Sequence, residues 1–145
     1  MYYAIKMMNK KDLQKKKVGR DKTAYDCVLD ELNVMQRLEH TNIIWLHEII
    51  DDPSKASIYL VTEYHSKGSL GDQLNDLNRD MDKKLPSIGI MTSNVRLYSI
   101  DICKALFYCH NVIQVIHRDI KPDNIMINDQ NKAVLIDFGV SALVD

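Results

Sequence analysis

The chain has 145 residues, of which 46% are apolar and 27% charged, which suits one modest hydrophobic core in a globular domain. Its formal net charge of −1 excludes a strong overall attraction to nucleic acid or to an acidic membrane surface. The three cysteines are scattered and odd in number, so they fit a reducing compartment better than a disulfide framework. The apolar runs are far shorter than a membrane span, and lysines interrupt the N-terminal one at once. We therefore expect a cytoplasmic protein, with the nucleus as an alternative location.

The first half of the chain is predicted to form a strand, a helix and two further strands. Residues 2–8 form a short β-like run, and a basic, polar segment follows from 9 to 22. Apolar residues between 23 and 39 recur at helical spacing, which predicts an amphipathic helix. Residues 43–50 and 57–62 are rich in β-forming side chains, and a turn signal containing a proline separates them.

The next segments are predicted to be a break, a short helix and a loop. Residues 66–69 contain serine, lysine and glycine and interrupt the preceding strand. A short helix is predicted near residues 70–77. Residues 78–93 are polar and include a proline and a glycine, so they are predicted to be a loop.

The last part of the chain is predicted to form a long helix and a hairpin. Thr92 or Ser93 could cap a helix that runs to about Asn111. Two short strands should then bracket residues 128–131, a hairpin turn. The helix residues that we expect to face a core are Val95, Ile100, Ala105, Leu106 and Tyr108.

Two motifs near the C-terminal end carry the chemistry. The first, from His117 to Asn124, reads H-R-D-x-K-P-x-N, and the second is Asp137-Phe138-Gly139. They occur in this order within a short stretch, and each follows an apolar run. The pair resembles the catalytic loop and the metal-binding turn of eukaryotic protein kinases. The resemblance covers nearly the whole chain, and it implies an α+β, two-lobed fold and phosphoryl transfer from ATP.

The resemblance also implies a division of the chain. Residues 1–62 would form an incomplete N-lobe with its sheet and helix C, 63–69 the hinge, and 70–145 the first part of a helical C-lobe. No glycine-rich loop precedes Lys6, and the chain stops at Asp145 within the activation segment, so we expect a domain truncated at both ends. We also expect exposed apolar surface that a complete domain would cover, and therefore marginal stability.

Phosphoryl transfer depends on positioning and on charge neutralisation along the triphosphate. Lys6 lies in a Y-A-I-K sequence that resembles the strand lysine contacting the α- and β-phosphates, although an isolated strand lysine is usually a solvated edge residue. Glu31 is the preferred partner for Lys6, because the residues after it resemble the family pattern E-(I/L)-x-x-M-x-x-L-x-H-x-N-I. Asp30 and Glu39 are the alternatives, and Glu31 could also be a solvated helix residue.

The two motifs supply the expected catalytic and metal-binding residues. Asp119 is expected to accept the proton of the substrate hydroxyl, and Lys121 to neutralise charge on the migrating phosphoryl group. A lysine at the position of Lys121 is typical of serine/threonine kinases. Asn124 and Asp137 are expected to hold Mg²⁺, which prefers oxygen ligands. Each residue alone could be a polar group of a hairpin loop, but the whole set is very improbable by chance.

The segment from Thr62 to Leu70 resembles the kinase hinge. The backbones of Glu63 and His65 are expected to bind the adenine edge of ATP. Thr62 is expected to gate the space behind the adenine, and its small side chain predicts room there for bulky inhibitors.

The resemblance assigns further contacts around the nucleotide. Ala4 and Met126 are expected to sandwich the adenine ring, and Ser69 is expected to reach the ribose. His117 is expected to be structural, stacking with Phe138, rather than a base or a metal ligand.

Partners are predicted from the remaining segments. The lysines and arginine between 10 and 22 are more often a solvated loop than a docking patch, and no aromatic residue is interleaved, so we expect no nucleic acid and no membrane. The insertion before Glu31, the 48–53 linker and the sequence from Asp137 to Ser141 resemble the calcium/calmodulin-dependent protein kinase kinase group. The expected partner is therefore a protein substrate such as a downstream kinase, and calmodulin could bind only through segments absent from this chain.

A second interpretation is a kinase-like interaction module without transferase activity, or an inactive fragment. The intact candidate residues favour a serine/threonine kinase using ATP and Mg²⁺, because a module that transfers nothing has no chemical need for them. They are Lys6, Glu31, Asp119, Asn124 and Asp137.

Overall fold

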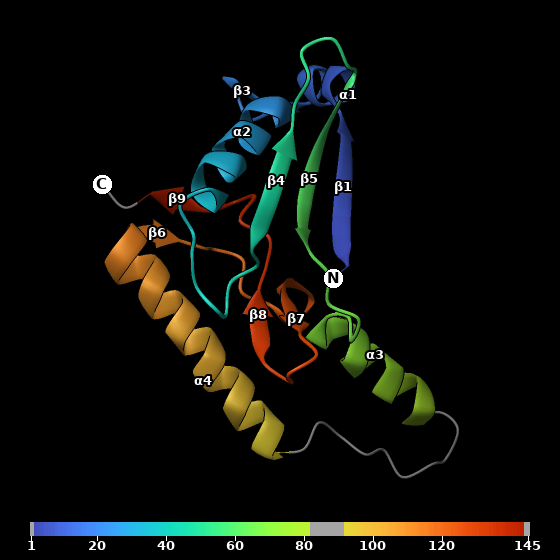
Figure 1. Ribbon diagram of the computed structural model, residues 1–145, viewed down its shortest axis with the longest axis vertical. Coiled ribbons are helices and arrows are strands. Elements are labelled where there is room, and N and C mark those ends of the chain that lie inside the picture. The colour runs from blue at the N-terminus through green and yellow to red at the C-terminus, as the bar shows by residue number, and fades with distance from the viewer. Residues whose placement is uncertain (1, 82–91, 144–145) are drawn as a thin grey trace.

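The computed structural model describes residues 2–81 and 92–143, and Figure 1 shows them as two groups of elements. One group is a three-stranded antiparallel sheet with a helix, α2, beside it. The other contains two helices and a small hairpin. The sheet has the order β1-β5-β4, formed by β1 (Tyr3–Asn9), β5 (Ser57–Glu63) and β4 (Leu46–Ile50).

The sheet register determines which side chains of β1 face inward. Ala4 lies opposite Thr62 and Lys6 lies opposite Leu60 on the central strand. Side chains alternate along a strand, so Ala4 and Lys6 share one face of the sheet. Ile5, on the other face, is 65% exposed. The predictions of strands at 2–8 and 57–62 are confirmed to within one residue.

The predicted strand at 43–50 is shorter than expected. It begins at Leu46, because Ile43 and Ile44 pair elsewhere. Ile43 forms a bridge with Leu135, and the Ile44 amide donates to the Leu135 carbonyl at 2.9 Å. These β-forming residues therefore connect the sheet to the second group of elements instead of extending the sheet.

Helix α2 (Ala24–Met35) confirms the predicted amphipathic helix. It begins with a capping box in which Thr23 and Asp26 bond each other's backbone amides, a feature that stabilises a helix by about 1 kcal/mol. It ends at Met35, and Leu38 is nevertheless buried in the turn that follows. Its buried side chains are Val28, Glu31, Leu32, Val34 and Met35.

The polar segment before α2 is folded. It contains a short helix, α1 (Lys10–Lys15), and a small hairpin of β2 (Lys17–Val18) and β3 (Lys22–Thr23). Lys10 donates to the Asp52 carbonyl at 2.7 Å. At the other end Lys22 pairs with Asp30 of α2 at 2.7 Å. Lys10 and Lys22 therefore attach the two ends of this segment to the rest of the protein.

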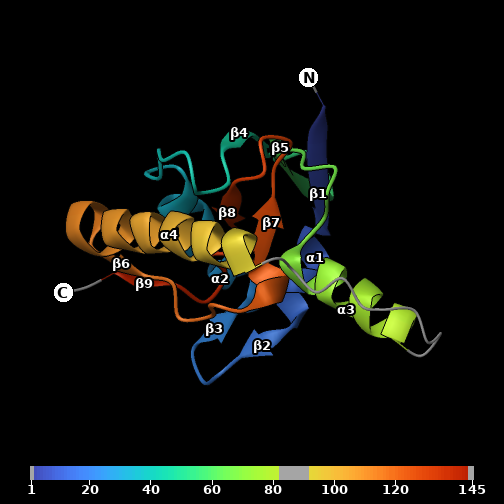
Figure 2. The same ribbon diagram turned by 90° about the horizontal axis from the view of Figure 1, so that it is seen from below.

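The second group of elements includes two helices that Figure 2 shows diverging from the β7–β8 hairpin. Helix α3 is longer than predicted, because residues 78–81 of the predicted loop are helical. The last residues of that predicted loop, 92 and 93, belong to α4, and those between lie outside the described residues. A π-helical turn, Cys109–Ile113, extends α4 close to the predicted end of the helix. The elements are α3 (Leu70–Met81), α4 (Thr92–Tyr108), β6 (Val115–Ile116), β7 (Ile125–Ile127), β8 (Ala133–Leu135) and β9 (Ala142–Leu143).

The predicted core face of α4 is partly wrong. Val95 is 49% exposed and Ile100 is 41% exposed, whereas Ala105 is buried as predicted and Leu106 and Tyr108 are partly buried. Apolar residues occur all around this helix, so their spacing does not single out one face. The buried face includes an aspartate whose hydrogen-bond partner is distant in sequence. The buried residues of α4 are Tyr98, Asp101, Ile102 and Ala105, and Cys109 of the π-helical turn is buried next to them.

One hydrophobic core joins the two groups. Met35 from α2, Ile43, Leu135 and Phe138 belong to the same buried cluster as Ala105 of α4. No helix in the described part of the chain is long and apolar enough to span a bilayer. Apolar side chains also remain exposed, among them Phe107 at 67%, Met7 at 67%, Ile5 at 65% and Val112 at 60%.

Candidate active site

A cavity of about 400 Å³ lies between the sheet, α2 and the β7–β8 hairpin. Its size is within the range of small-molecule sites. Side chains from distant parts of the sequence line it, and most of them were predicted as site residues. These are Ala4, Lys6, Glu31, Thr62, Glu63, His65, Met126 and Asp137.

Lys6 and Glu31 meet at this cavity. The Lys6 ammonium lies 3.8 Å from a Glu31 carboxylate oxygen, and the Glu31 side chain is only 8% exposed while that of Lys6 is 57% exposed. Burial raises the pKa of Glu31; Lys6 opposes that rise and Asp137 adds to it. The alternative Asp30 is exposed and pairs with Lys22, and the alternative Glu39 is exposed. The geometry therefore joins Lys6 to Glu31, as the sequence pattern indicated.

The loop after β6 brings three predicted residues into one hydrogen-bonded group. The Asp119 carboxylate accepts from Lys121 Nζ at 2.6 Å and from Asn124 Nδ2 at 2.9 Å. The hydrogen bond from Lys121 lowers the pKa of Asp119; burial opposes the effect and the Asn124 bond adds to it. Asp119 is therefore a carboxylate near neutral pH, which is the form that can accept a proton.

The backbone is unusual on both sides of this group. Arg118 has φ 67° and Asp137 has φ 64°, a left-handed conformation that few residues other than glycine adopt. The Arg118 guanidinium donates to the Val140 carbonyl at 2.6 Å and to the Ser141 carbonyl at 3.2 Å. These bonds tie the loop that carries Asp119 to the segment after Asp137. Such conformations often occur at functional sites, where surrounding contacts hold them.

His117 is a structural residue in this arrangement. Its side chain is almost fully buried, and its ring lies edge-on to Phe138 with centroids 4.8 Å apart, which confirms the predicted contact. The Asp119 amide donates to Nδ1, so Nε2 carries the proton and donates to the Ile136 carbonyl at 2.9 Å. Burial lowers the pKa of His117, although the Ile136 carbonyl and nearby carboxylates oppose this. A neutral ring bonded at both nitrogens is neither a free base nor a metal ligand.

Asn124 and Asp137 offer oxygen donors suited to Mg²⁺. Asn124 Nδ2 donates to Asp119, so its amide oxygen is the end that remains for a cation. The Asp137 carboxylate faces the cavity and accepts one backbone bond from Gly139 at 3.2 Å. No group of three or more His, Cys, Asp or Glu side chains in the described residues could hold a metal by itself. Mg²⁺ usually keeps water or phosphate oxygens among its ligands, so this sparse donor set fits it.

Ser69 is not brought into the cavity with the other residues. Its hydroxyl donates to Asp72 at 2.7 Å and accepts from the Asp72 amide at 3.0 Å, so it caps helix α3. The sequence contained the signal for this role, because a serine followed three residues later by an acidic residue is a capping pattern. The expected ribose contact therefore has no support in the position of this side chain.

Sequence analysis missed several residues of the cavity wall. Leu60 precedes Thr62 by two positions on β5, so strand alternation could have identified it. Ile44 and Tyr64 have no comparable signal, because their positions depend on how the two halves pack. The cavity residues not predicted are Met35, Ile44, Leu60, Tyr64 and Ile136.

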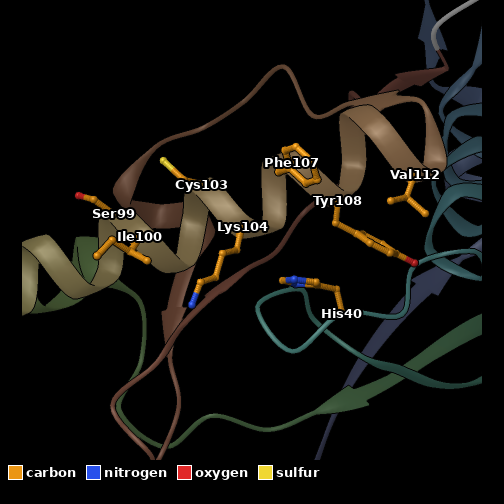
Figure 3. Close-up of a pocket in the computed structure, with 8 residues that line it drawn as sticks. All are labelled: His40, Ser99, Ile100, Cys103, Lys104, Phe107, Tyr108 and Val112. Atoms are coloured by element: carbon orange, nitrogen blue, oxygen red, sulfur yellow. The ribbon is translucent and has the colours of Figure 1, made fainter.

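A larger cavity, of about 630 Å³, lies along α4 and is shown in Figure 3. His40 stacks on Tyr108 at its lower side, with ring centroids 5.2 Å apart. Burial and the charge of Lys104 lower the pKa of His40. None of the predicted site residues lines this cavity, and its other members are Ser99, Ile100, Cys103, Phe107 and Val112. Among the described residues, this larger cavity has no ion pair comparable to Lys6 and Glu31. We therefore take the smaller cavity as the candidate active site.

Comparison with known proteins agrees with this geometry. The protein kinase domain model matches residues 1–145. A probable serine/threonine-protein kinase of Dictyostelium discoideum is 36% identical over 99% of this chain and 19% of its own length. The serine/threonine-protein kinase GRIK2 of Arabidopsis thaliana is 37% identical over 97% of the chain and 32% of its length. The serine/threonine-protein kinase ssp1 of Schizosaccharomyces pombe is 35% identical over 98% of the chain and 20% of its length.

The chain thus spans about a third or less of the length of these relatives. Its α+β architecture and the joined groups of Lys6 with Glu31 and Asp119 with Asn124 are what that family's chemistry requires. The chain belongs to the protein kinase domain family.

Proposed function

We propose that this chain carries the nucleotide pocket and the catalytic residues of an ATP-dependent protein serine/threonine kinase. The observation that carries the proposal is the position of Asp119. Its ionised carboxylate is held by Lys121 and Asn124, and Asp137 at the nearby cavity wall faces the Lys6–Glu31 pair. Glu31, Asp137 and Lys6 thereby line a pocket of nucleotide size, and Asp119 and Lys121 lie on the catalytic-loop segment beside it.

In the proposed reaction the hydroxyl oxygen of a serine or threonine attacks the γ-phosphorus of ATP. The bond from that phosphorus to the bridging oxygen of ADP breaks, and Asp119 accepts the hydroxyl proton. Lys121 stabilises negative charge on the transferred phosphoryl group, and Glu31 holds Lys6 toward the α- and β-phosphates. Mg²⁺, when bound at Asn124 and Asp137, supplies charge neutralisation for the phosphates.

The hinge part of the proposal concerns adenine. Ala4 and Thr62 are cross-strand partners, and both line the cavity. Met126 comes from the β7–β8 hairpin and could pack on the opposite face of the ring from Ala4. The backbones of Glu63 and His65 would then supply the hydrogen bonds to the adenine edge. Trp45 supports this segment, since its amide donates to the Glu63 carboxylate at 3.0 Å.

We further propose membership of the calcium/calmodulin-dependent protein kinase kinase group, with a downstream protein kinase as substrate and the cytoplasm as location. The support is sequence alone: the insertion before α2, the 48–53 linker and the stretch from Asp137 to Ser141 resemble that group. The basic segment has no exposed aromatic residue interleaved with its cations, so nucleic acid is not a proposed partner. Calmodulin would act only through segments outside this chain.

The test is a thermal melt of the chain with and without ATP and Mg²⁺. Binding to the folded state alone raises the melting temperature, so a cooperative melt should shift upward with nucleotide. The matched control is Lys6→Met, which should reduce the shift. A cooperative melt without any shift would contradict the proposal and favour the interaction module. If the shift is present, phosphoryl transfer to a serine-containing peptide should be assayed next.

A further inference from the structure

The turn between β7 and β8, residues 128–131, contacts two segments that are distant in sequence. On one side the Ser66 hydroxyl donates to a carboxylate oxygen of Asp129 at 2.8 Å, and Lys67 Nζ donates to the Asp129 carbonyl at 3.3 Å. On the other side the Tyr98 hydroxyl of α4 donates to the Asn131 side-chain oxygen at 2.9 Å. The turn therefore lies between the hinge segment and helix α4.

The hinge segment also follows strand β7 along its backbone. The Ile127 amide donates to the Gly68 carbonyl at 3.1 Å, and Ser69 forms a bridge with Met126. Gly68 has φ 70°, a conformation that suits glycine. Met126 lines the cavity. The same hairpin that carries one wall of the cavity thus also holds the hinge segment.

The turn is closed by its own hydrogen bonds and is held from one side by α4. The Asn128 side chain accepts from the Lys132 amide at 2.9 Å, and the Asn131 amide donates to the Asn128 carbonyl at 2.9 Å. Asp101 of α4 accepts from the Ala133 amide at 3.1 Å, just after the turn. Asp129 is therefore presented from a closed turn that α4 holds in place. Within the hinge itself the Gly68 amide lies a long 3.4 Å from the His65 carbonyl.

We propose that Asp129 is a positioning residue that fastens hinge residues 65–69 to the strand carrying Met126, and so fixes the spacing of the nucleotide cavity. Its carboxylate is a charged acceptor, and bonds to charged acceptors are stronger than neutral ones. Asp129 and Ser66 are exposed, so water competes for the bond and the expected effect is moderate. The expected effect on nucleotide affinity rests on the proposed function, whereas the expected effect on the mobility of the hinge backbone does not.

The first measurement is amide hydrogen exchange of residues 64–69 in the full chain without nucleotide. Asp129→Ala removes the acceptor for Ser66, so exchange in the hinge should accelerate by about threefold to tenfold. Ser66→Ala should reproduce most of this effect, and the double variant should exceed the single variants by little, because both remove the same bond. Asp129→Asn keeps an oxygen acceptor and should restore slow exchange.

The second measurement is the dissociation constant for ADP with Mg²⁺, by titration calorimetry on the same variants. Asp129→Ala should weaken binding by about threefold to tenfold, with Asp129→Asn close to the unmodified chain. The matched control is Gln130→Ala, which changes the next residue of the same exposed turn and should leave both measurements unchanged.

Unchanged hinge exchange in Asp129→Ala would overturn the proposal, and so would a lower melting temperature with unchanged exchange and unchanged affinity. Faster exchange with unchanged affinity, in a chain that binds ADP, would overturn the positioning role. If the unmodified chain binds no nucleotide, the proposed function fails and the role of Asp129 in the cavity fails with it. Hinge exchange would then still decide whether Asp129 fastens the hinge.

Discussion

The two cavities described above differ in what lines them. The active-site cavity of about 400 Å³ has charged side chains from the sheet, from α2 and from the segment after β8, whereas the α4 cavity of about 630 Å³ is lined mainly by one helix. Volume alone would therefore select the wrong site. Chemistry requires groups of opposite charge that converge from several elements, and only tertiary packing can hold them together against their preference for water.

The largest expected effect is on phosphoryl transfer after replacement of Asp119, the proposed general base. Asp119→Asn in a catalytically active form of the protein should reduce phosphoryl transfer by about a hundredfold to ten-thousandfold, because the amide cannot accept the hydroxyl proton. Nucleotide affinity should change little. Transfer to a serine peptide and the dissociation constant for ATP with Mg²⁺ measure the two quantities. Undiminished transfer would remove Asp119 from its proposed role.

The second prediction concerns the buried carboxylate. Lys6→Met leaves Glu31 without its cation, so the free energy of unfolding should fall by about 1–2 kcal/mol near neutral pH, less than for a fully buried pair because Lys6 is half exposed. Burial already raises the folded-state pKa of Glu31 above its ordinary value. A raised carboxyl pKa means that stability is greatest below the ordinary pKa and is lost as pH rises through the folded-state value.

Lys6→Met should raise the pKa of Glu31 further, so the melting temperature of this variant should fall more steeply than that of the unmodified chain as pH rises above the ordinary pKa of a glutamate. Glu31→Gln in the Lys6→Met background should remove that steep pH dependence. Parallel melting curves for Lys6→Met and the unmodified chain would show that the pair does not act as described.

A smaller effect is expected at the helix cap. Ser69→Ala removes the capping hydroxyl of α3 and should lower the free energy of unfolding by about 1 kcal/mol. ATP affinity should stay within about twofold, because Ser69 lies outside the cavity wall. Denaturant unfolding and a nucleotide titration separate these outcomes. Weaker ATP binding with unchanged stability would restore the ribose contact that the sequence suggested.

The smallest effect is expected in the α4 cavity. Phe107 is 67% exposed, so Phe107→Ser should change stability by at most about 0.5 kcal/mol and should not alter nucleotide affinity. Thermal melts and the same nucleotide titration apply. A loss of nucleotide affinity in Phe107→Ser would break the distinction between the two cavities.

Local patterns predicted most elements. The helix at 24–35 and the strands at 3–9 and 57–63 agree with residue spacing, because spacing reflects which side of an element is buried. Spacing failed for α4, where Val95 and Ile100 are exposed and Asp101 is buried. A buried aspartate is tolerated there because its carboxylate accepts a bond from Ala133, a partner 32 residues away. No local pattern contains that information.

The sequence by itself determined the family and the candidate chemistry, because the motifs H-R-D-x-K-P-x-N and D-F-G contain the candidate catalytic and metal-binding residues in the order typical of protein kinases. It also favoured Glu31 over Asp30 as the partner of Lys6. Only the tertiary structure decided that His117 is neutral and bonded at both nitrogens, and that Asp129 contacts the hinge. The physical reason is that hydrogen bonds and burial depend on atoms brought together by packing, and these partners are separated by up to 63 residues.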